Sequence, residues 1–176
     1  FSPDPAGFYS IAVMHGEAEV LALQARRFHY WALGGRYDRS TLQGSPNVIH
    51  YCGSPQGRCP AHGGIHGCTL VEVDPQRQTR TSFLPTDAAR WQTERVVVDE
   101  ATTRDDLETR LRERIGALSD ASPTTALLVS WVISGRGPVI SQLHRTKGTD
   151  QLLQWLRDDF GRRSPVAWSV AVDVES

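Results

Sequence analysis

The residues after about position 90 alternate between strand-type and helix-type patterns, and this alternation constrains the fold more than any other feature of the sequence. Two runs, Arg95 to Asp99 and the nearly continuous apolar Thr125 to Ser134, are typical of strands. Between them, Thr103 can cap a helix with Asp106 three residues on, and apolar residues then recur at helical spacing. The pattern therefore predicts a helix from Thr103 to Leu118 between two strands.

The last fifty or so residues continue the same alternation. A short helix is expected after Pro138, and an apolar stripe from Leu152 to Phe160 predicts a second helix, ended by Gly161. Large and small residues then alternate from Val166 to Val174, which is typical of a strand. The order strand, helix, strand, helix, helix, strand predicts a small two-layer α/β domain over residues 91–176.

Residues 1–90 have a different character, because their apolar runs are short and are separated by turn-forming residues. Only Glu17 to Arg27 could form a short helix in this part. Most of this half is therefore expected to be sheet, and the whole chain falls in the mixed α/β (α+β) class. The expected strands are Tyr9 to Met14, Phe28 to Leu33, Val48 to Cys52, Cys68 to Val73 and, more weakly, Thr79 to Phe83.

Composition excludes several classes of protein. The 176 residues carry 19 basic and 20 acidic side chains, so any contact with nucleic acid has to come from a local cluster of charge. The longest apolar runs fall far short of the roughly 20 residues that cross a bilayer, so no membrane segment is expected. Three cysteines without a secretory signal favour free thiols in a reducing compartment, the cytoplasm.

Three segments of the first half contain residue types that can support chemistry. The segment IAVMHG places His15 at the end of an apolar strand, YWALGGRY runs from a strand into a glycine pair, and YCGSPQGR is rich in turn residues. A further set of thiols and imidazoles has the composition of a structural zinc site, although its spacing matches no pair of zinc knuckles. The residues of this zinc alternative are Cys59, His62, His66 and Cys68.

In this order, the segments IAVMHG, YWALGGRY, YCGSPQGR and GCTLVEVD resemble the calcineurin-like metallophosphoesterases, in particular the DNA-repair exonucleases of the SbcD type. That resemblance implies the late strands of a metallophosphoesterase β-sandwich in residues 1–90, followed by a small capping domain in residues 91–176. It also implies a phosphodiesterase with two manganese ions, which hold the scissile phosphate and activate water.

The family's metal ligands are only partly present. By resemblance, His15 matches a histidine ligand, whereas the two histidines of the family's G-H-x-H motif are replaced by Gly35 and Tyr37, and the aspartate before Y-W-A-L-G by His29. The family's D-x-H, G-D and G-N-H motifs would precede Phe1. One imidazole cannot hold two divalent ions, so we expect the chain alone to lack nuclease activity.

The resemblance also predicts partners. The remaining half of the catalytic domain, in the same polypeptide or in a second chain, is expected to cover the inner faces of the strands, and DNA and an SbcC-like ATPase are the further partners. Without that half, we expect the following side chains to be exposed: Ile11, Val13, Trp31, Leu33, Ile49 and Leu70.

Two interpretations stay open. In the first, the chain is the C-terminal part of an SbcD-like nuclease, with Arg36, Arg39 and Arg58 as candidate phosphate contacts that could equally be solvated surface arginines. In the second, it is a degenerate, non-catalytic relative that acts as a scaffold or regulatory subunit of a DNA-repair complex. Loss of the two G-H-x-H histidines, at Gly35 and Tyr37, favours the second interpretation.

Overall fold

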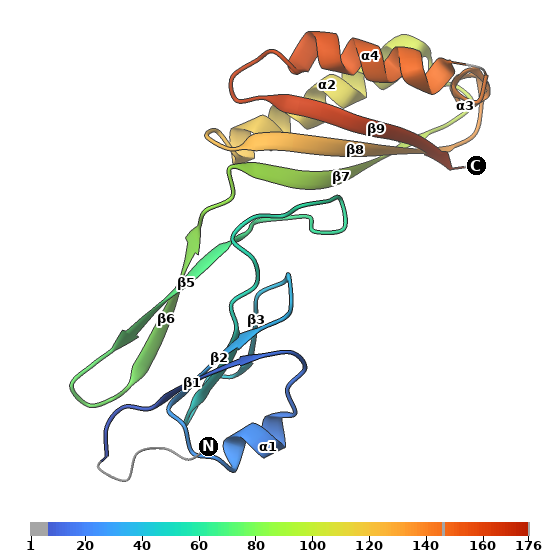
Figure 1. Ribbon diagram of the computed structural model, residues 1–176. Helices are drawn as coiled ribbons and strands as arrows, with labels where there is room; N and C mark the ends of the chain where they lie inside the picture. The colour runs from blue at the N-terminus through green and yellow to red at the C-terminus, as the bar shows by residue number, and fades with distance from the viewer. Residues whose placement is uncertain (1–6, 146, 176) are drawn as a thin grey trace. The chain divides into compact units, whose positions relative to one another are not determined.

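The computed structural model describes residues 7–145 and 147–175 (Figure 1). The chain divides into two compact units. Unit 1 comprises Phe1–Gly57 and Ile65–Asp87, and unit 2 comprises Arg58–Gly64 and Ala88–Ser176. The short segment of unit 2 is held there because Gly63 forms a parallel β-bridge with Trp91. The elements of both units confirm the mixed α/β (α+β) class.

Unit 1 is built on a four-stranded sheet in the order β1-β2-β4-β3. Its first three members, β1 (Ile11–His15), β2 (Tyr30–Gly34) and β4 (Val48–Tyr51), run parallel to one another. The fourth, β3 (Ser40–Gln43), runs antiparallel to β4. Because these three strands are parallel, their carboxyl ends lie together at one end of the sheet.

One face of this sheet is covered by the chain's own residues. The helix α1 (Val20–Gln24) and the segment after it place Leu23 and Phe28 against Trp31, Leu33 and Ile49. These last three side chains are therefore buried, and the expectation that they would be exposed is wrong. The same expectation is confirmed for three other residues, Ile11, Val13 and Leu70, which are exposed.

The remaining strands of unit 1 form a separate antiparallel pair, β5 (Gly67–Val73) and β6 (Thr79–Pro85). Side-chain hydrogen bonds join this pair to the rest of the unit. His50 of β4 bonds Thr69 of β5, and the hydroxyl of Tyr9 bonds that of Thr79 of β6.

Unit 2 contains a three-stranded parallel sheet in the order β7-β8-β9. Helices α2 and α4 lie along one face of this sheet, as Figure 1 shows. The elements follow in chain order as β7 (Ala89–Val98), α2 (Arg104–Ala121), β8 (Ala126–Gly135), α3 (Pro138–Leu143), α4 (Gly148–Phe160) and β9 (Ala167–Glu175). This is the strand and helix order that the sequence predicts.

The core of unit 2 lies between that sheet face and the helices. Leu107 and Leu111 of α2, Leu156 of α4, and Trp131 and Ile133 of β8 are all fully or almost fully buried there. The indole N–H of Trp131 donates to Ser169 Oγ of β9 at 3.0 Å, so the largest buried side chain of the unit has its polar atom paired. Apolar burial and hydrogen-bond satisfaction are both complete at this point.

The strand β9 changes the face that it presents to the core. Ala167 and Ser169 are buried at its start, whereas Val172 and Val174 pack on the core at its end. The pairing with β8 shifts register between Val129 and Ser130, which is the effect of a bulge. The alternation of large and small residues therefore does not assign one size of side chain to one face along the whole strand.

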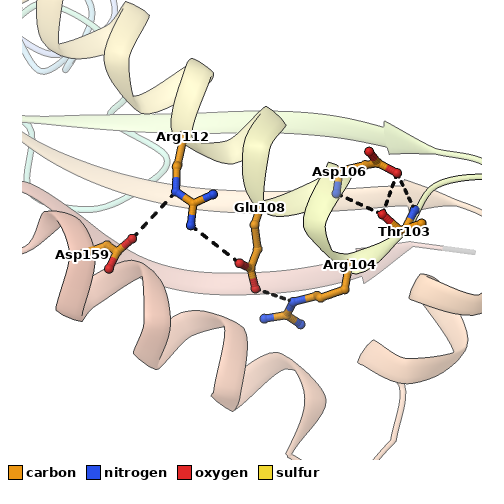
Figure 2. A network of polar contacts seen from close by, with 6 residues as sticks. All are labelled: Thr103, Arg104, Asp106, Glu108, Arg112 and Asp159. Carbon is orange, nitrogen blue, oxygen red and sulfur yellow. Dashed lines mark hydrogen bonds and ion pairs between the residues drawn. The ribbon is translucent and has the colours of Figure 1, made fainter.

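Helix α2 begins with the capping box expected at Thr103. The backbone N–H of Asp106 donates to Thr103 Oγ1, and the Asp106 carboxylate accepts from Thr103 in return, which holds the pKa of that carboxyl below its usual range (Figure 2). Further along α2, Glu108 lies between Arg104 and Arg112, and Arg112 also lies 3.9 Å from an oxygen of Asp159 on α4.

Both outer strands of the unit 2 sheet have backbone carbonyls that accept hydrogen bonds from arginines. Arg110 of α2 donates to the carbonyl of Val97 in β7 at 2.8 Å. Arg157 of α4 donates to the carbonyls of Ser169 and Val170 in β9 at 2.9 and 3.1 Å. Long cationic side chains across a sheet edge discourage pairing with another chain.

Two further predictions concern membrane-spanning helices and the cysteines. In the part of the chain that the structure describes, no helix has both the length and the apolar character needed to cross a membrane. Cys52, Cys59 and Cys68 are free cysteines, which agrees with the prediction of unpaired thiols.

Candidate functional site

The carboxyl ends of β1, β2 and β4 place predicted site residues of unit 1 at one end of the sheet. His15 ends β1, and the register pairs it with Gly34, the last residue of β2. Cys52 follows β4, and its backbone N–H donates to the carbonyl of Leu33. Ligands of parallel sheets bind outside the carboxyl ends of the strands, so this end of the sheet is the candidate site of unit 1.

Gly35 lies directly against the end of β1. It has a φ of +102°, and a Cβ atom at this position would lie 2.9 Å from the backbone nitrogen of Gly16 and 3.6 Å from the ring of His15. A side chain here would therefore strain the backbone and meet Gly16. The residue that replaces the first G-H-x-H histidine occupies a position where this backbone favours glycine.

Tyr37 belongs to a loop that is tied to the segment after β4. Its carbonyl accepts from the backbone N–H of Ser54 at 3.0 Å, and the residue as a whole is 43% exposed. A phenol is a poor ligand for manganese unless it is ionised. The position of the second G-H-x-H histidine is therefore ordered in the backbone but lacks a suitable donor.

Arg36 is held by groups of its own unit. Its guanidinium lies 2.6 Å from a carboxylate oxygen of Glu17 and 4.2 Å from the centre of the Tyr51 ring. The hydrogen bond that Arg36 donates to the Glu17 carboxylate raises the pKa of Arg36. Because Tyr51 also donates its hydroxyl to the carbonyl of Gly16, these residues form one cluster beside His15. A phosphate at this edge would have to compete with Glu17 for the guanidinium.

The other two candidate phosphate contacts, Arg39 and Arg58, belong to different units. Arg39 stacks on the ring of Phe83, with 4.5 Å between its central carbon and the ring centre. Arg58 belongs to the short segment of unit 2. Of the two candidate arginines in unit 1, Arg36 is the one that contacts Glu17 and Tyr51 beside His15.

The described residues do not fit a two-manganese site. Within residues 7–145 and 147–175, no group of three or more histidine, cysteine, aspartate or glutamate side chains could hold a metal ion. His15 is exposed at the end of β1, and Gly35 beside it has no side-chain donor. One imidazole supplies too few ligands for two divalent ions.

The zinc alternative finds no support in the same search. Its residues are divided between the units, with Cys59 and His62 in unit 2, and His66 and Cys68 in unit 1. The two imidazoles have other hydrogen-bond partners, since His66 Nδ1 bonds Ser54 Oγ at 2.9 Å and His62 Nδ1 accepts from the backbone of Arg58. No group with the ligand count of a structural zinc site forms among the described residues.

Two histidines that carry no metal role join parts of unit 1. His50 is 1% exposed, and its two ring nitrogens bond Thr41 of β3 and Thr69 of β5, each at 2.9 Å. Burial lowers the pKa of His50, and the nearby charge of Arg39 lowers it further. His29, where the resemblance leads us to expect an aspartate, stacks on Tyr9 and accepts from the backbone N–H of Ser10, so it has a structural role.

Sequence reasoning missed His50, because a histidine in a short apolar run gives no signal of its bonding partners. The available hint was that His50 stands within the apolar run Val48 to Tyr51, and all four positions of this strand are buried. A polar side chain in such a strand needs hydrogen-bond partners, and the threonines of β3 and β5 provide them.

Residues 91–176 match the family described as "Metallophosphoesterase YhaO, middle domain". The match covers the sheet of unit 2 from Trp91 onward together with its helices. No curated protein matches the chain. The family match supports the metallophosphoesterase superfamily, which is also the superfamily that the motifs around His15 resemble.

Proposed function

We propose that this chain forms part of a metal-dependent phosphodiesterase of the SbcD type that acts on DNA, with residues 91–176 as its capping domain. The observation that carries the proposal is the family match of residues 91–176 to a domain of a metallophosphoesterase. The order of motifs around His15, Gly35 and Arg58 in residues 8–75 is the second, independent support.

In this proposal the chain contributes one ligand and a supporting cluster to the metal cleft. His15 offers an exposed imidazole at the carboxyl end of β1, and the backbone of Gly16 receives the hydroxyl of Tyr51, which fixes the turn after that histidine. Arg36 is positioned beside it by Glu17. The remaining metal ligands come from the complementary half of the catalytic domain, in the same polypeptide or in a second chain.

The chain alone therefore does not hydrolyse DNA. The test is incubation of the purified chain with linear duplex DNA and manganese, together with calorimetric titration of manganese into the protein. We expect neither DNA degradation above background nor stoichiometric manganese binding. Manganese-dependent degradation that disappears in His15→Ala and persists in the control variant His29→Ala would overturn this part of the proposal.

A non-catalytic role is the second candidate, and Gly35 is the observation that favours it. With a φ of +102° and the nitrogen of Gly16 against the position of its missing Cβ, the backbone at Gly35 disfavours the family's histidine. Such a relative would act in the cytoplasm as a scaffold or regulatory subunit that binds an SbcC-like ATPase.

The sequence of the proposed complementary half, wherever it is encoded, separates the two candidates. D-x-H and G-N-H motifs there favour the nuclease, and their erosion favours the scaffold. Co-expression of that sequence with the present chain, followed by the same manganese assay, gives the biochemical counterpart. Activity in the combined protein is expected for the nuclease and would contradict the scaffold.

A further inference from the structure

A groove in unit 2 lies apart from the candidate site of unit 1. It opens between the last turns of α2, the end of α4 and the loop that leads into β9, and its floor includes Ile115, Phe160 and Pro165. Its volume is about 260 Å³, slightly below the roughly 300 to 1,000 Å³ of most ligand sites. A groove of this size fits one small molecule.

The groove is open because α2 has a glycine in its interior. Gly116 lines the groove, and its φ is not in the left-handed region. A Cβ atom at this position would have no described group within 4 Å, so no neighbouring residue requires a glycine. Glycine is unfavourable inside a helix, because it increases the entropy that is lost on folding. A ligand that lies over Gly116 gives this glycine a function.

Arg163 lines the groove and has unused hydrogen-bond donors. Its guanidinium stacks on the ring of Phe160, with 4.5 Å between the central carbon and the ring centre. Its Nε–H donates to the carbonyl of Asp159 at 2.7 Å. These two contacts orient the guanidinium, and its two terminal nitrogens have no hydrogen-bond partner among the described residues.

Arg112 lines the same groove and is oriented in a similar way. Its guanidinium stacks on the ring of Trp155, with 4.9 Å between the central carbon and the ring centre. Its nitrogens lie 3.8 Å from an oxygen of Glu108 and 3.9 Å from one of Asp159, which is longer than a hydrogen bond (Figure 2). Both arginines therefore offer N–H donors in the planar arrangement that matches a phosphate.

The remaining polar lining consists of two hydroxyls and one carboxylate. Ser119 and Ser164 supply the hydroxyls, which can also bond a phosphate, and Asp120 supplies the carboxylate. A carboxylate only accepts hydrogen bonds, so Asp120 repels an inorganic anion and binds a ligand that has N–H or O–H donors of its own. The groove therefore fits a molecule with a phosphate at one end and an apolar body with donors at the other.

We propose that this groove binds a free nucleoside monophosphate. The phosphate pairs with Arg112 and Arg163, the base lies over Gly116 on the apolar floor, and a base amine or a sugar hydroxyl donates to Asp120. Guanidinium planes also stack on bases. A sugar phosphate would leave the apolar floor unused, and a fatty acid would place an apolar chain against Asp120. The inference does not rest on the proposed nuclease function, because unit 2 alone forms the groove.

Calorimetric titration of the full chain with AMP, GMP, CMP and UMP tests the inference. At least one nucleotide should bind with a Kd below about 1 mM. The corresponding nucleoside and inorganic phosphate should each bind at least about tenfold more weakly, because each contacts only one end of the groove. Absence of binding by all four nucleotides, or equal binding of inorganic phosphate and the best nucleotide, would overturn the inference.

The phosphate end is tested by Arg163→Gln, which should weaken nucleotide binding at least about tenfold, because charged donors are lost. Arg162→Gln is the matched control. Arg162 is the preceding residue, is exposed and is not among the described residues that line the groove. Both variants remove one positive charge, so equal weakening in the two would mean that general charge attracts the nucleotide, and the inference would be wrong.

The floor is tested by Gly116→Leu, which fills the groove. It should abolish binding and leave the chain at least as stable, because leucine favours a helix more than glycine does. Ala117→Leu adds a leucine at the next, exposed position of α2, outside the described lining of the groove, and should keep the original affinity. Unchanged affinity in Gly116→Leu would contradict the inference.

The acceptor end is tested by Asp120→Ala, which should weaken nucleotide binding about fivefold because a hydrogen-bond acceptor is lost. Unchanged or tighter nucleotide binding in this variant would make the groove a general anion site and would overturn the inference. Tighter binding of a 5′-phosphorylated dinucleotide than of any mononucleotide would also overturn it, because the ligand would then be the end of a strand.

Discussion

The edge strands of the two units differ in whether arginine side chains form hydrogen bonds with their backbone groups. In unit 2, the edge carbonyls of β7 and β9 accept hydrogen bonds from Arg110 and Arg157. In unit 1, the outward backbone groups of β1 have no such partner in the described chain, and the exposed Val13 lies among them. Arginine side chains over an edge strand discourage pairing with another strand, whereas unpaired backbone groups on an edge strand are available for such pairing.

The buried tryptophans show the same contrast. Trp131 of unit 2 donates its indole N–H to Ser169, whereas that of Trp31 of unit 1 has no acceptor among the described residues. Both side chains are almost fully buried, so the cost of an unpaired donor applies to Trp31 alone. The comparison shows that the buried indole donor is paired in unit 2 and has no partner among the described residues of unit 1.

The largest effect that tests this contrast is expected when a core side chain of unit 2 and an edge side chain of unit 1 are each truncated. Leu111→Ala in the fully buried centre of unit 2 should lower the free energy of unfolding of that unit by about 2 to 5 kcal/mol. Val13→Ala on the open edge of unit 1 should change stability by less than about 0.5 kcal/mol, because the side chain is already in water. Urea unfolding followed by NMR signals of each unit measures both values. Similar losses at the two positions would contradict the contrast.

A smaller effect is expected from a side chain at Gly35. Gly35→His restores one histidine of the family motif but should destabilise unit 1 by about 1 to 3 kcal/mol, because φ is +102° and the new Cβ meets Gly16. Gly44→His is the control, since a Cβ at Gly44 has no atom within 4 Å and its φ is not in the left-handed region. Thermal unfolding of both variants, with manganese titration, gives the result. A stable Gly35→His variant that binds manganese would mean that the family's site geometry is retained.

The arginine on the β9 edge should contribute about 1 to 2 kcal/mol to unit 2. Arg157→Met keeps much of the apolar length of the side chain over Trp168 and removes the donors to Ser169 and Val170. We also expect the variant to associate at concentrations where the unchanged chain does not, because the β9 edge is then open. Sedimentation velocity is the measurement, and unchanged stability and association would show that the arginine does not protect this edge.

The smallest of these effects is expected from a change in pH, which should lower the stability of unit 1 at a higher pH than that of unit 2. Neutral His50 is buried between two threonines with its pKa lowered, so its contribution to unit 1 is complete above about pH 6.5 and is lost as the pH falls through the lower folded-state pKa. Unit 2 has lowered pKa values at Asp99 and Asp106, whose contributions are present above about pH 4 and are lost only below it.

Urea midpoints of the two units at pH 7, 6 and 5 test this prediction. Unit 1 should weaken across that range, and His50→Gln should reduce the change. Equal loss in both units, or an unchanged slope in His50→Gln, would contradict the assignment to His50.

The sequence predicted unit 2 better than unit 1, for physical reasons. The predicted helix Thr103 to Leu118 is observed as Arg104–Ala121, because a capping box and a regular apolar stripe are local signals. The predicted strand from Arg95 begins instead at Ala89, since polar residues interrupt the pattern before Arg95. In unit 1 the strand Ser40–Gln43 was not predicted at all, because its STLQ sequence has no apolar alternation and its pairing with β4 is a tertiary contact.

The candidate site was predictable only where the signal was local. The position of His15 at a strand end follows from the sequence, and the structure places it there. The burial of Trp31, Leu33 and Ile49 could not be predicted, because it depends on how α1 and Phe28 fold back on the sheet. For the same reason, only Ile11, Val13 and Leu70 are exposed among the six side chains that the sequence led us to expect in water.

Amide hydrogen exchange along β1 tests the central claim most directly, namely that unit 1 keeps an unpaired strand edge while unit 2 is complete. In the chain alone, we predict fast exchange at Ile11, Val13 and His15, whose N–H groups point outward, and slow exchange at Ala12 and Met14, which bond β2. The central strand β8 of unit 2 should be protected at every position, because β7 and β9 pair with it on both sides. Uniform protection along β1 would contradict the account.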